Sequence, residues 1–126
     1  MKIIKAVTLA ILTAFFLKLF VFDFIIAQGH SMEPAIKDGT VLIVSRIRYG
    51  IRMPRQQDYL INWAQPKPGE VVVFYTSAGE LAVKRCKNLT EWNSFYVEGD
   101  NAGTSYDSRS YGPVPFNNVI GKVLGY

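Results

Sequence analysis

The chain has 126 residues, which is enough for one compact domain and a short additional segment. Its 14 Lys and Arg residues exceed its 10 Asp and Glu residues, and the charge of +4 is spread along the sequence without forming a basic block, so nucleic-acid binding is not expected. A single cysteine, Cys86, excludes an intramolecular disulfide, and a single histidine, His30, leaves too few ligands for the usual metal clusters. We therefore expect no metal and no other cofactor.

The N-terminal segment predicts a membrane-spanning helix over roughly residues 2–19. Lys2 and Lys5 precede an apolar run from Ala6 to Leu17, and Lys18 interrupts this run before four further apolar residues. A helical span needs about 20 apolar residues, so the segment suffices if the lysines at its two ends extend to opposite interfaces. Lysines at its start favour an orientation that leaves the rest of the chain on the outer face. The alternative is a cleaved secretory signal peptide, but no clear small-x-small site follows the apolar run, so a retained anchor is favoured.

The remaining residues, 21–126, predict one β-rich domain after an anchor over 1–20. Residues 22–26 form an extended segment that leads into it, and 48–68, with three prolines and three arginines, predict a long surface excursion. Runs of β-branched and aromatic residues, bounded by turn residues, indicate short strands: 41–44, 71–75, 81–85, 95–97 and 119–124. Short strands without a strongly amphipathic helix favour a mostly β fold, a small barrel-like or sandwich domain.

Ser31 is a candidate nucleophile in the segment Gly-His-Ser-Met-Glu-Pro at 29–34. A serine beside a glycine is ordinarily a turn hydroxyl, and it needs a base to become a nucleophile. His30 is adjacent, but neighbouring side chains in extended backbone point to opposite faces. Since there is no second histidine, a Ser-His-Asp triad is excluded, and His30 is expected to be a polar surface or rim residue.

Lys84 is a candidate base, provided that its amine is neutral. The ordinary pKa of a lysine is about 10.4 and each unit of depression costs about 1.36 kcal/mol, so an apolar wall must supply about 3 kcal/mol to reach roughly 8. Lys84 follows the apolar residues 81–83 on a predicted strand and shares a face with Ala82. Taken alone, this segment fits a solvated strand lysine better. Three further lysines lie in turn-like contexts where solvation is expected: Lys37, Lys67 and Lys122.

A third polar segment follows the turn at residues 99–101. Asp107 and Arg109 are close enough in sequence to form a structural ion pair, and Ser105 is a candidate hydrogen-bond partner for a lysine amine. Without the other two segments, these residues would be interpreted as polar turn residues.

Together these segments resemble the bacterial type I signal peptidases, membrane-bound serine endopeptidases that use a Ser/Lys dyad. The similarity covers nearly the whole chain, and the S-M-x-P and G-D-N…S-x-D-S-R elements are specific in combination. The matching stretches are FLKLFVFDFIIAQ, GHSMEP, KDGTVLIVSR, VVVFY after PKPGE, VKRCKN and GDNAGTSYDSRSYGPVP.

The resemblance implies that Ser31 is the nucleophile and Lys84 the general base, that Ser105 orients the amine of Lys84, and that Asp107 and Arg109 form a supporting salt bridge. It also implies a substrate class, preproteins that carry N-terminal signal peptides, which are cut after small residues. The protein would be a single-pass protein of the inner cell membrane, with the catalytic domain on the outer or periplasmic face and an apolar surface against the lipid.

The resemblance further implies shallow substrate pockets, into which the substrate is expected to add as an extended strand. Some relatives carry a serine at the position of Gly29 that helps to bind the oxyanion, so backbone N–H groups alone are expected to do so here. The matching substrate-binding residues are Ile25, Ala27, Gly29, Met32, Ile36, Leu42, Ala82 and Val83.

Three alternatives remain at the level of sequence. The chain could be a specialised leader or maturation peptidase of a conjugation system or of an organelle inner membrane. It could also be a catalytically silent, membrane-tethered β module that binds exported chains, although such a module has no need for both Ser31 and Lys84. A soluble self-cleaving repressor shares this type of dyad, but the apolar N-terminal segment argues against it.

Overall fold

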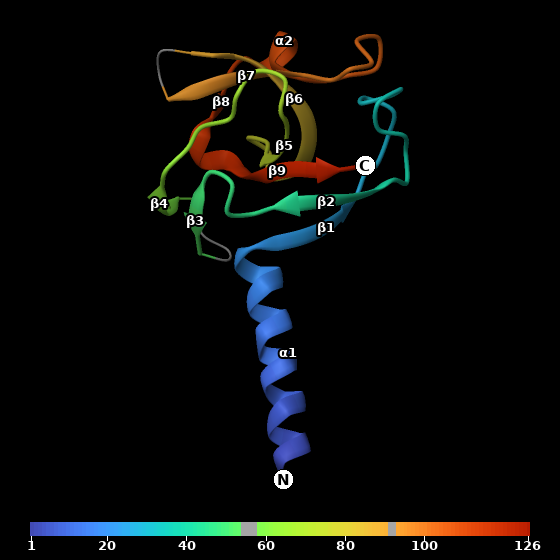
Figure 1. Cartoon of the computed structure of the whole chain (residues 1–126). Coiled ribbons are helices and arrows are strands. Elements are labelled where there is room, and N and C mark those ends of the chain that lie inside the picture. Colours follow the sequence, from blue (N-terminus) through green and yellow to red (C-terminus); the bar gives the residue numbers. More distant parts are fainter. Residues whose placement is uncertain (54–57, 91–92) are drawn as a thin grey trace.

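The computed structural model describes residues 1–53, 58–90 and 93–126, in which one helix projects from a curled β domain (Figure 1). The elements in chain order are α1 (Lys2–Phe20), β1 (Phe22–Ile26), β2 (Val41–Ser45), β3 (Gly50–Arg52), β4 (Tyr59–Asn62), β5 (Val71–Tyr75), β6 (Leu81–Leu89), β7 (Ser94–Glu98), α2 (Ser108–Tyr111), β8 (Val114–Pro115), a 3₁₀ turn η1 (Phe116–Asn118) and β9 (Val119–Gly125). The expected mostly β, barrel-like domain behind one N-terminal apolar helix is confirmed.

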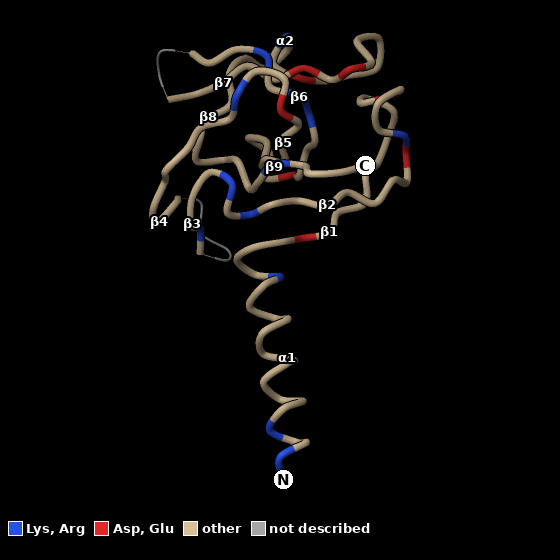
Figure 2. The backbone as a smooth tube through the Cα atoms, viewed as in Figure 1, with Lys and Arg blue, Asp and Glu red and all other residues tan. Residues whose placement is uncertain are grey.

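Helix α1 stands apart from the β domain and buries none of its residues. Its 19 residues span about 28 Å at the usual helical rise, close to the thickness of a bilayer core. Basic residues lie near both of its ends and its middle is free of charge (Figure 2). The helix is therefore long and apolar enough to cross a membrane.

Seven strands form one antiparallel sheet in the order β1-β2-β9-β5-β6-β7-β8, and β3 and β4 form a separate hairpin. The sheet curls, so its two faces enclose different groups of side chains (Figure 1). Strand β5 is central, and side chains alternate between the faces of a strand. Val71 and Val73 accordingly pack in one apolar cluster, whereas Val72 and Phe74 pack in the other.

The first cluster lies beneath the turn that follows β1 and supports the site described below. It consists of Ala27, Met32, Ile36, Leu42, Val44, Val71, Val73, Ile120 and Val123. The second cluster fills the other side of the sheet with Tyr49, Val72, Phe74, Cys86, Phe95, Val97, Val114 and Val119.

The expected surface excursion over 48–68 is wrong for the part of this segment that the structure describes. Residues of β3 and β4 pair there, and Arg52 is only 6% exposed. The Arg52 guanidinium donates to the carbonyl oxygens of Asn117 and Val119, at 2.6 and 2.8 Å. These bonds satisfy a buried charge and tie the hairpin to the start of β9. Pro54 and Arg55, two of the residues behind the expectation, lie outside the described residues.

Other expected elements agree with the structure, some of them with shifted boundaries. Strand β6 continues beyond the expected end at 85 to Leu89 because residues 85–89 pair with β7. The short helix α2 was not expected, and Asp107 caps it by accepting a hydrogen bond from the backbone N–H of Arg109.

Candidate active site

Ser31 and Lys84 meet at one end of a cleft, with 2.7 Å between Ser31 Oγ and Lys84 Nζ. The two residues are 53 positions apart in sequence. Ser31 belongs to the turn after β1, and Lys84 lies on β6. Because the sheet curls, β1 and β6 lie on opposite sides of the cleft although several strands separate them within the sheet.

The environment of Lys84 favours a neutral amine. The residue is only 7% exposed, and burial lowers the pKa of its side chain below the ordinary lysine value. The charge of Asp107 opposes this change by raising the pKa, and the charge of Arg109 lowers it. The net effect is a lowered pKa, so the amine can lose its proton under milder conditions than an exposed lysine.

The turn that carries Ser31 is held by contacts on both sides of the hydroxyl. Met32 and Ile36 are buried in the first apolar cluster, and the backbone N–H of Ile36 donates to the carbonyl of Met32. Gly29 has a φ of 85°, a conformation that favours glycine, and its N–H donates to Asp38 Oδ1 at 2.8 Å. This hydrogen bond already occupies the N–H of Gly29. The expectation that backbone N–H groups around Ser31 bind the oxyanion therefore stays a prediction.

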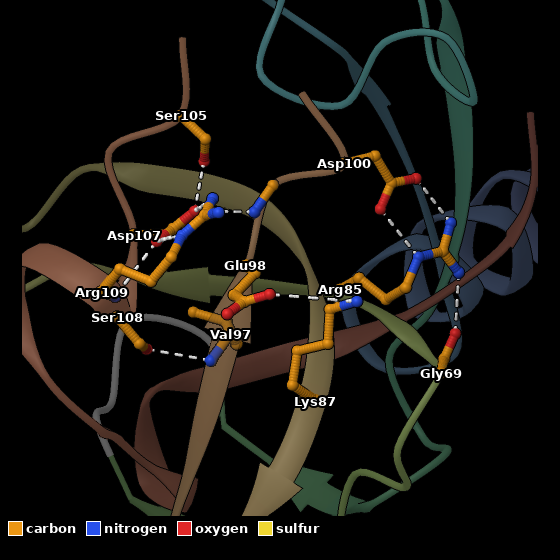
Figure 3. Close-up of polar contacts among 11 residues, drawn as sticks. Gly69, Arg85, Lys87, Val97, Glu98, Asp100, Ser105, Asp107, Ser108 and Arg109 are labelled. Carbon is orange, nitrogen blue, oxygen red and sulfur yellow. Dashed lines mark hydrogen bonds and ion pairs between the residues drawn. The ribbon is translucent and has the colours of Figure 1, made fainter. Parts of the chain in front are cut away.

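A short segment, Gly99 to Asn101, links the nucleophile turn to the strand of the base. The backbone N–H of Asn101 donates to the carbonyl of Ser31 at 2.8 Å, and its side-chain amide donates to the carbonyl of His30 at 3.1 Å. Asp100 accepts two hydrogen bonds from Arg85, the residue after Lys84, at 2.9 and 2.8 Å (Figure 3). The segment therefore contacts the backbone of Ser31 directly and the side chain of Arg85, the neighbour of Lys84.

Sequence reasoning identified neither Asn101 nor the Arg85–Asp100 pair. The available signal was weak, namely the position of Arg85 beside Lys84 and of Asp100 in the G-D-N element. Ion pairs between residues 15 positions apart depend on strand register, which the sequence alone did not determine.

Asp107 is fully buried and anchors a second polar cluster beside the segment Gly99 to Asn101 (Figure 3). Arg109 donates to it through Nε at 3.0 Å and Nη2 at 2.6 Å, which forms the expected ion pair. Burial raises the pKa of Asp107, but hydrogen bonds from Arg109, Ser105 and the backbone of Gly99 more than offset that effect and hold the pKa well below its usual range. Asp107 is thus a charged acceptor at neutral pH.

Ser105 donates its hydroxyl to Asp107 Oδ2 at 2.6 Å. Within the described part of the chain, the amine of Lys84 forms its hydrogen bond with Ser31 and not with Ser105. Gly99 lies between the groups, and a side chain there would collide with both Ser105 and the carbonyl of Ser31. Ser105 thus lies close to the nucleophile turn, and its expected role of orienting the amine stays a prediction.

His30 and Glu33 form an exposed pair at the rim, with 2.8 Å between His30 Nδ1 and Glu33 Oε1. The hydrogen bond and the charge of Glu33 raise the pKa of His30. His30 therefore has an acidic partner of its own on the surface, as expected for a rim residue. Among the residues that the structure describes, no group of three or more His, Cys, Asp or Glu side chains could hold a metal ion.

A cleft of about 850 Å³ extends from Ser31 and Lys84 between the β1 segment and the start of β6. Of the residues expected to bind substrate, those that line it are Ile25, Ala27, Gly29, Met32, Ile36, Ala82 and Val83. Sequence reasoning missed five other lining residues: Phe24, Ile26, Gln28, Glu80 and Leu81.

Leu42 is the exception among the expected substrate-binding residues, because it does not line the cleft. Its side chain is 0% exposed and packs in the first apolar cluster with Ala27, Met32 and Ile36. Leu42 on β2 is the cross-strand partner of Ile25 on β1, which lines the cleft and packs against the first apolar cluster. The direct contact expected for Leu42 is therefore wrong, and this residue supports the cleft from behind.

A serine and a buried lysine at the end of an apolar cleft, in a β domain behind a possible membrane span, define a membrane-associated serine endopeptidase. The family model for signal peptidase, peptidase S26, matches residues 1–90 and 86–125, and the chain therefore belongs to this family. The resemblance inferred from the sequence is confirmed.

Relatives with known names are similar over most of their length. Signal peptidase I of Bacillus caldolyticus is 26% identical over 145 residues, which cover 85% of this chain and 80% of that protein. Signal peptidase I of Leptolyngbya laminosa is 27% identical over 159 residues, with 98% and 77% covered. Mitochondrial inner membrane protease subunit 1 of Xenopus tropicalis is 26% identical over 110 residues, with 80% and 66% covered.

Proposed function

We propose that this member of the signal peptidase family removes N-terminal signal peptides from exported preproteins, with Ser31 as nucleophile and Lys84 as general base. The observation that carries the proposal is the 2.7 Å separation between Ser31 Oγ and Lys84 Nζ at the end of the cleft. Residues 1–20 are the membrane anchor and residues 21–126 the catalytic domain.

The reaction begins when the neutral amine of Lys84 accepts the proton of the Ser31 hydroxyl as Oγ attacks the carbonyl carbon of the scissile bond. The lysine then returns this proton to the leaving amine, and the acyl group stays on Ser31. A water molecule, activated by Lys84 in the same way, releases the signal peptide and regenerates the hydroxyl. The lowered pKa of Lys84 supports this role because a protonated amine cannot accept the proton.

Stabilisation of the tetrahedral oxyanion is assigned to backbone N–H groups around Ser31. Gly29 offers no side-chain hydroxyl for this purpose. Ser105 and Arg109 hold Asp107, which accepts from the N–H of Gly99, and two residues further on the N–H of Asn101 donates to the carbonyl of Ser31. Their role in this proposal is to position the reacting groups.

The cleft supports selectivity for small residues before the cut. Two alanines, Ala27 and Ala82, line it together with larger aliphatic side chains such as Val83. Substrates with Ala, Gly or Ser at the residue before the cut should be processed, whereas Leu or Phe there should prevent cleavage by collision with the walls. Peptides that differ in this residue alone test the expectation.

The proposed site of action is the outer or periplasmic face of the inner membrane, with α1 crossing once and lipid as a contact of the anchor. The charge distribution supports this orientation, because Lys2 and Lys5 lie at the end of α1 remote from the domain (Figure 2).

The test of function is to incubate the purified protein in non-ionic detergent with a preprotein and to sequence the new N-terminus. We expect a single cut after a small residue. Ser31→Ala should abolish cleavage without changing the melting temperature appreciably, since only the attacking oxygen is lost. Ser77→Ala, which alters an exposed turn serine, is the matched control and should be silent. Equal rates for Ser31→Ala and the parent would exclude Ser31 as the nucleophile.

A specialised maturation peptidase is the second candidate. The similarity to a mitochondrial inner membrane protease subunit favours it, because this relative is named as an organelle protease and not as a signal peptidase. A panel of unrelated preproteins separates the two functions. A general signal peptidase cleaves most of them, whereas a specialised peptidase cleaves one or a few.

A further inference from the structure

The end of the cleft remote from Ser31 carries an acidic side chain, Glu80. One wall of the cleft runs from Phe24 to Ser31, and the other runs from Glu80 to Lys84. Glu80 and Lys84 are the charged residues that line it, and they lie at opposite ends of the second wall. The mechanism uses Lys84 and gives no role to Glu80.

The turn between β5 and β6 fixes the backbone of Glu80. Its N–H donates to the hydroxyl of Thr76 at 3.2 Å, and its carbonyl accepts from the N–H of Thr76 at 2.8 Å. Gly79 allows the turn with a φ of 81°. The carboxylate itself is exposed, and no Lys, Arg or His among residues 1–53, 58–90 and 93–126 lies within salt-bridge distance of it. Glu80 thus presents an unneutralised negative charge at the cleft.

The distance from the reacting groups defines which substrate residue would reach Glu80. Lys84 lies four positions after Glu80, and four steps of extended chain span about 13 Å at the usual rise of a β-strand. A substrate that binds as an extended strand along β6 places the residue before the cut beside Lys84. The residue opposite Glu80 is then about four positions further toward the substrate N-terminus.

We propose that Glu80 forms a subsite at the far end of the cleft that favours a cationic side chain, Lys or Arg, at about the fifth residue before the cut and disfavours Asp or Glu there. The inference rests on the proposed function, because it needs the part of the substrate before the cut to occupy the cleft. The cleft supplies no other charge near this position, so Glu80 determines the sign of the preference.

The expected size of the effect follows from the exposure of Glu80. A solvent-exposed pair of opposite charges changes an equilibrium by about two- to fivefold, and a pair of like charges opposes it by a similar factor. A substrate with Glu in place of Lys at the fifth residue before the cut should therefore have a kcat/KM about five- to twentyfold lower at low ionic strength. High salt should reduce the difference because it screens exposed charges.

The experiment uses the full chain in non-ionic detergent and three peptides that differ only in the fifth residue before the cut, which is Lys, Gln or Glu. With the parent, kcat/KM should fall in that order. Glu80→Gln should make the three values equal, and Glu80→Lys should reverse the order. Glu98→Gln is the matched control, because it removes the same charge from β7, outside the cleft, and should keep the parent's order.

The position of the charged residue in the peptide tests the subsite separately from the proposed function. When the lysine is moved along the peptide, the preference should be largest at the fourth to sixth residue before the cut and absent after the cut. Equal rates for the Lys, Gln and Glu peptides, or the largest effect after the cut, would overturn the inference while leaving signal-peptide cleavage intact. Failure of the parent to cleave any peptide, together with its preprotein, would overturn the proposed function and this subsite with it.

Discussion

Substitution of Asp107 by asparagine tests how the polar cluster supports the site, because it removes one charge and keeps the shape of the side chain. Asp107 Oδ2 accepts hydrogen bonds from the N–H of Gly99, the hydroxyl of Ser105 and Nη2 of Arg109, at 2.8, 2.6 and 2.6 Å. Oδ1 accepts from the backbone N–H and Nε of Arg109, at 3.1 and 3.0 Å. An asparagine has one oxygen, so in either orientation its amide NH₂ faces at least one backbone N–H that has lost its acceptor.

The loss of stability can be bounded from these contacts. A buried donor without an acceptor costs about 1–3 kcal/mol, and breaking a buried ion pair costs about 3–5 kcal/mol. Since the side chain of Arg109 is 37% exposed and water can solvate it, we expect the lower part of this range. The free energy of unfolding should fall by about 3 kcal/mol, and the melting temperature by roughly 12–24 °C for a domain of about 100 residues.

The pH dependence of this loss follows from the pKa of Asp107, which the folded protein holds below its ordinary value. A carboxyl group with a depressed pKa stabilises the fold fully above its unfolded pKa of about 3.9, and this stabilisation is lost as the pH falls toward the folded pKa. The difference between the parent and Asp107→Asn should therefore be constant from pH 6 to 9 and shrink below about pH 4.

Activity provides a second readout of the same substitution. The charge of Asp107 raises the pKa of Lys84, so its removal should lower that pKa further. The rise of kcat/KM with pH should then occur at lower pH in Asp107→Asn, with a smaller maximum because the loop is less well held. Thermal melts in detergent and pH–rate profiles measure both effects, and Asp58→Asn, at an exposed position, is the control. A variant that melts within about 2 °C of the parent, or whose rise moves to higher pH, would refute this reasoning.

Three further predictions concern the base, the nucleophile turn and the topology. Because the lowered pKa of Lys84 permits a neutral amine, kcat/KM should rise from neutral into mildly alkaline pH. Lys84→Arg should abolish turnover, since a guanidinium stays charged, while the exposed Lys87→Arg should be nearly silent; an active Lys84→Arg enzyme or a flat parent profile would remove Lys84 from the mechanism. Asn101→Ala removes the hydrogen bond to the turn that carries Ser31 and should lower kcat about tenfold at a stability cost of about 1 kcal/mol, with KM unchanged; a changed KM with unchanged kcat would contradict a positioning role. A protease-accessible tag after Tyr126 should be cleaved from outside intact cells, and a protected tag would show that the orientation is wrong.

The sequence alone predicted most of the strands and the apolar N-terminal helix, because their signals are local. The run Val71 to Tyr75 is β-branched and aromatic, and its bounds agree with those of β5. The hairpin of β3 and β4 was missed because residues 48–68 combine strand-forming residues with prolines and charges, and because the buried guanidinium of Arg52 donates to carbonyl oxygens that lie 65 and 67 positions away. Local pattern carries no information about such partners.

The residue types of the candidate site were determined by the sequence, and so was the family, because its motifs are short and specific in combination. Tertiary structure alone decided which groups meet. The curl of the sheet brings Ser31 to Lys84 and leaves Leu42 in the core behind the cleft. It also places Glu80 at the far end of the cleft and Asp100 opposite Arg85. These contacts depend on strand order and register over tens of residues, which arise from packing of the two apolar clusters and not from the local sequence around each residue.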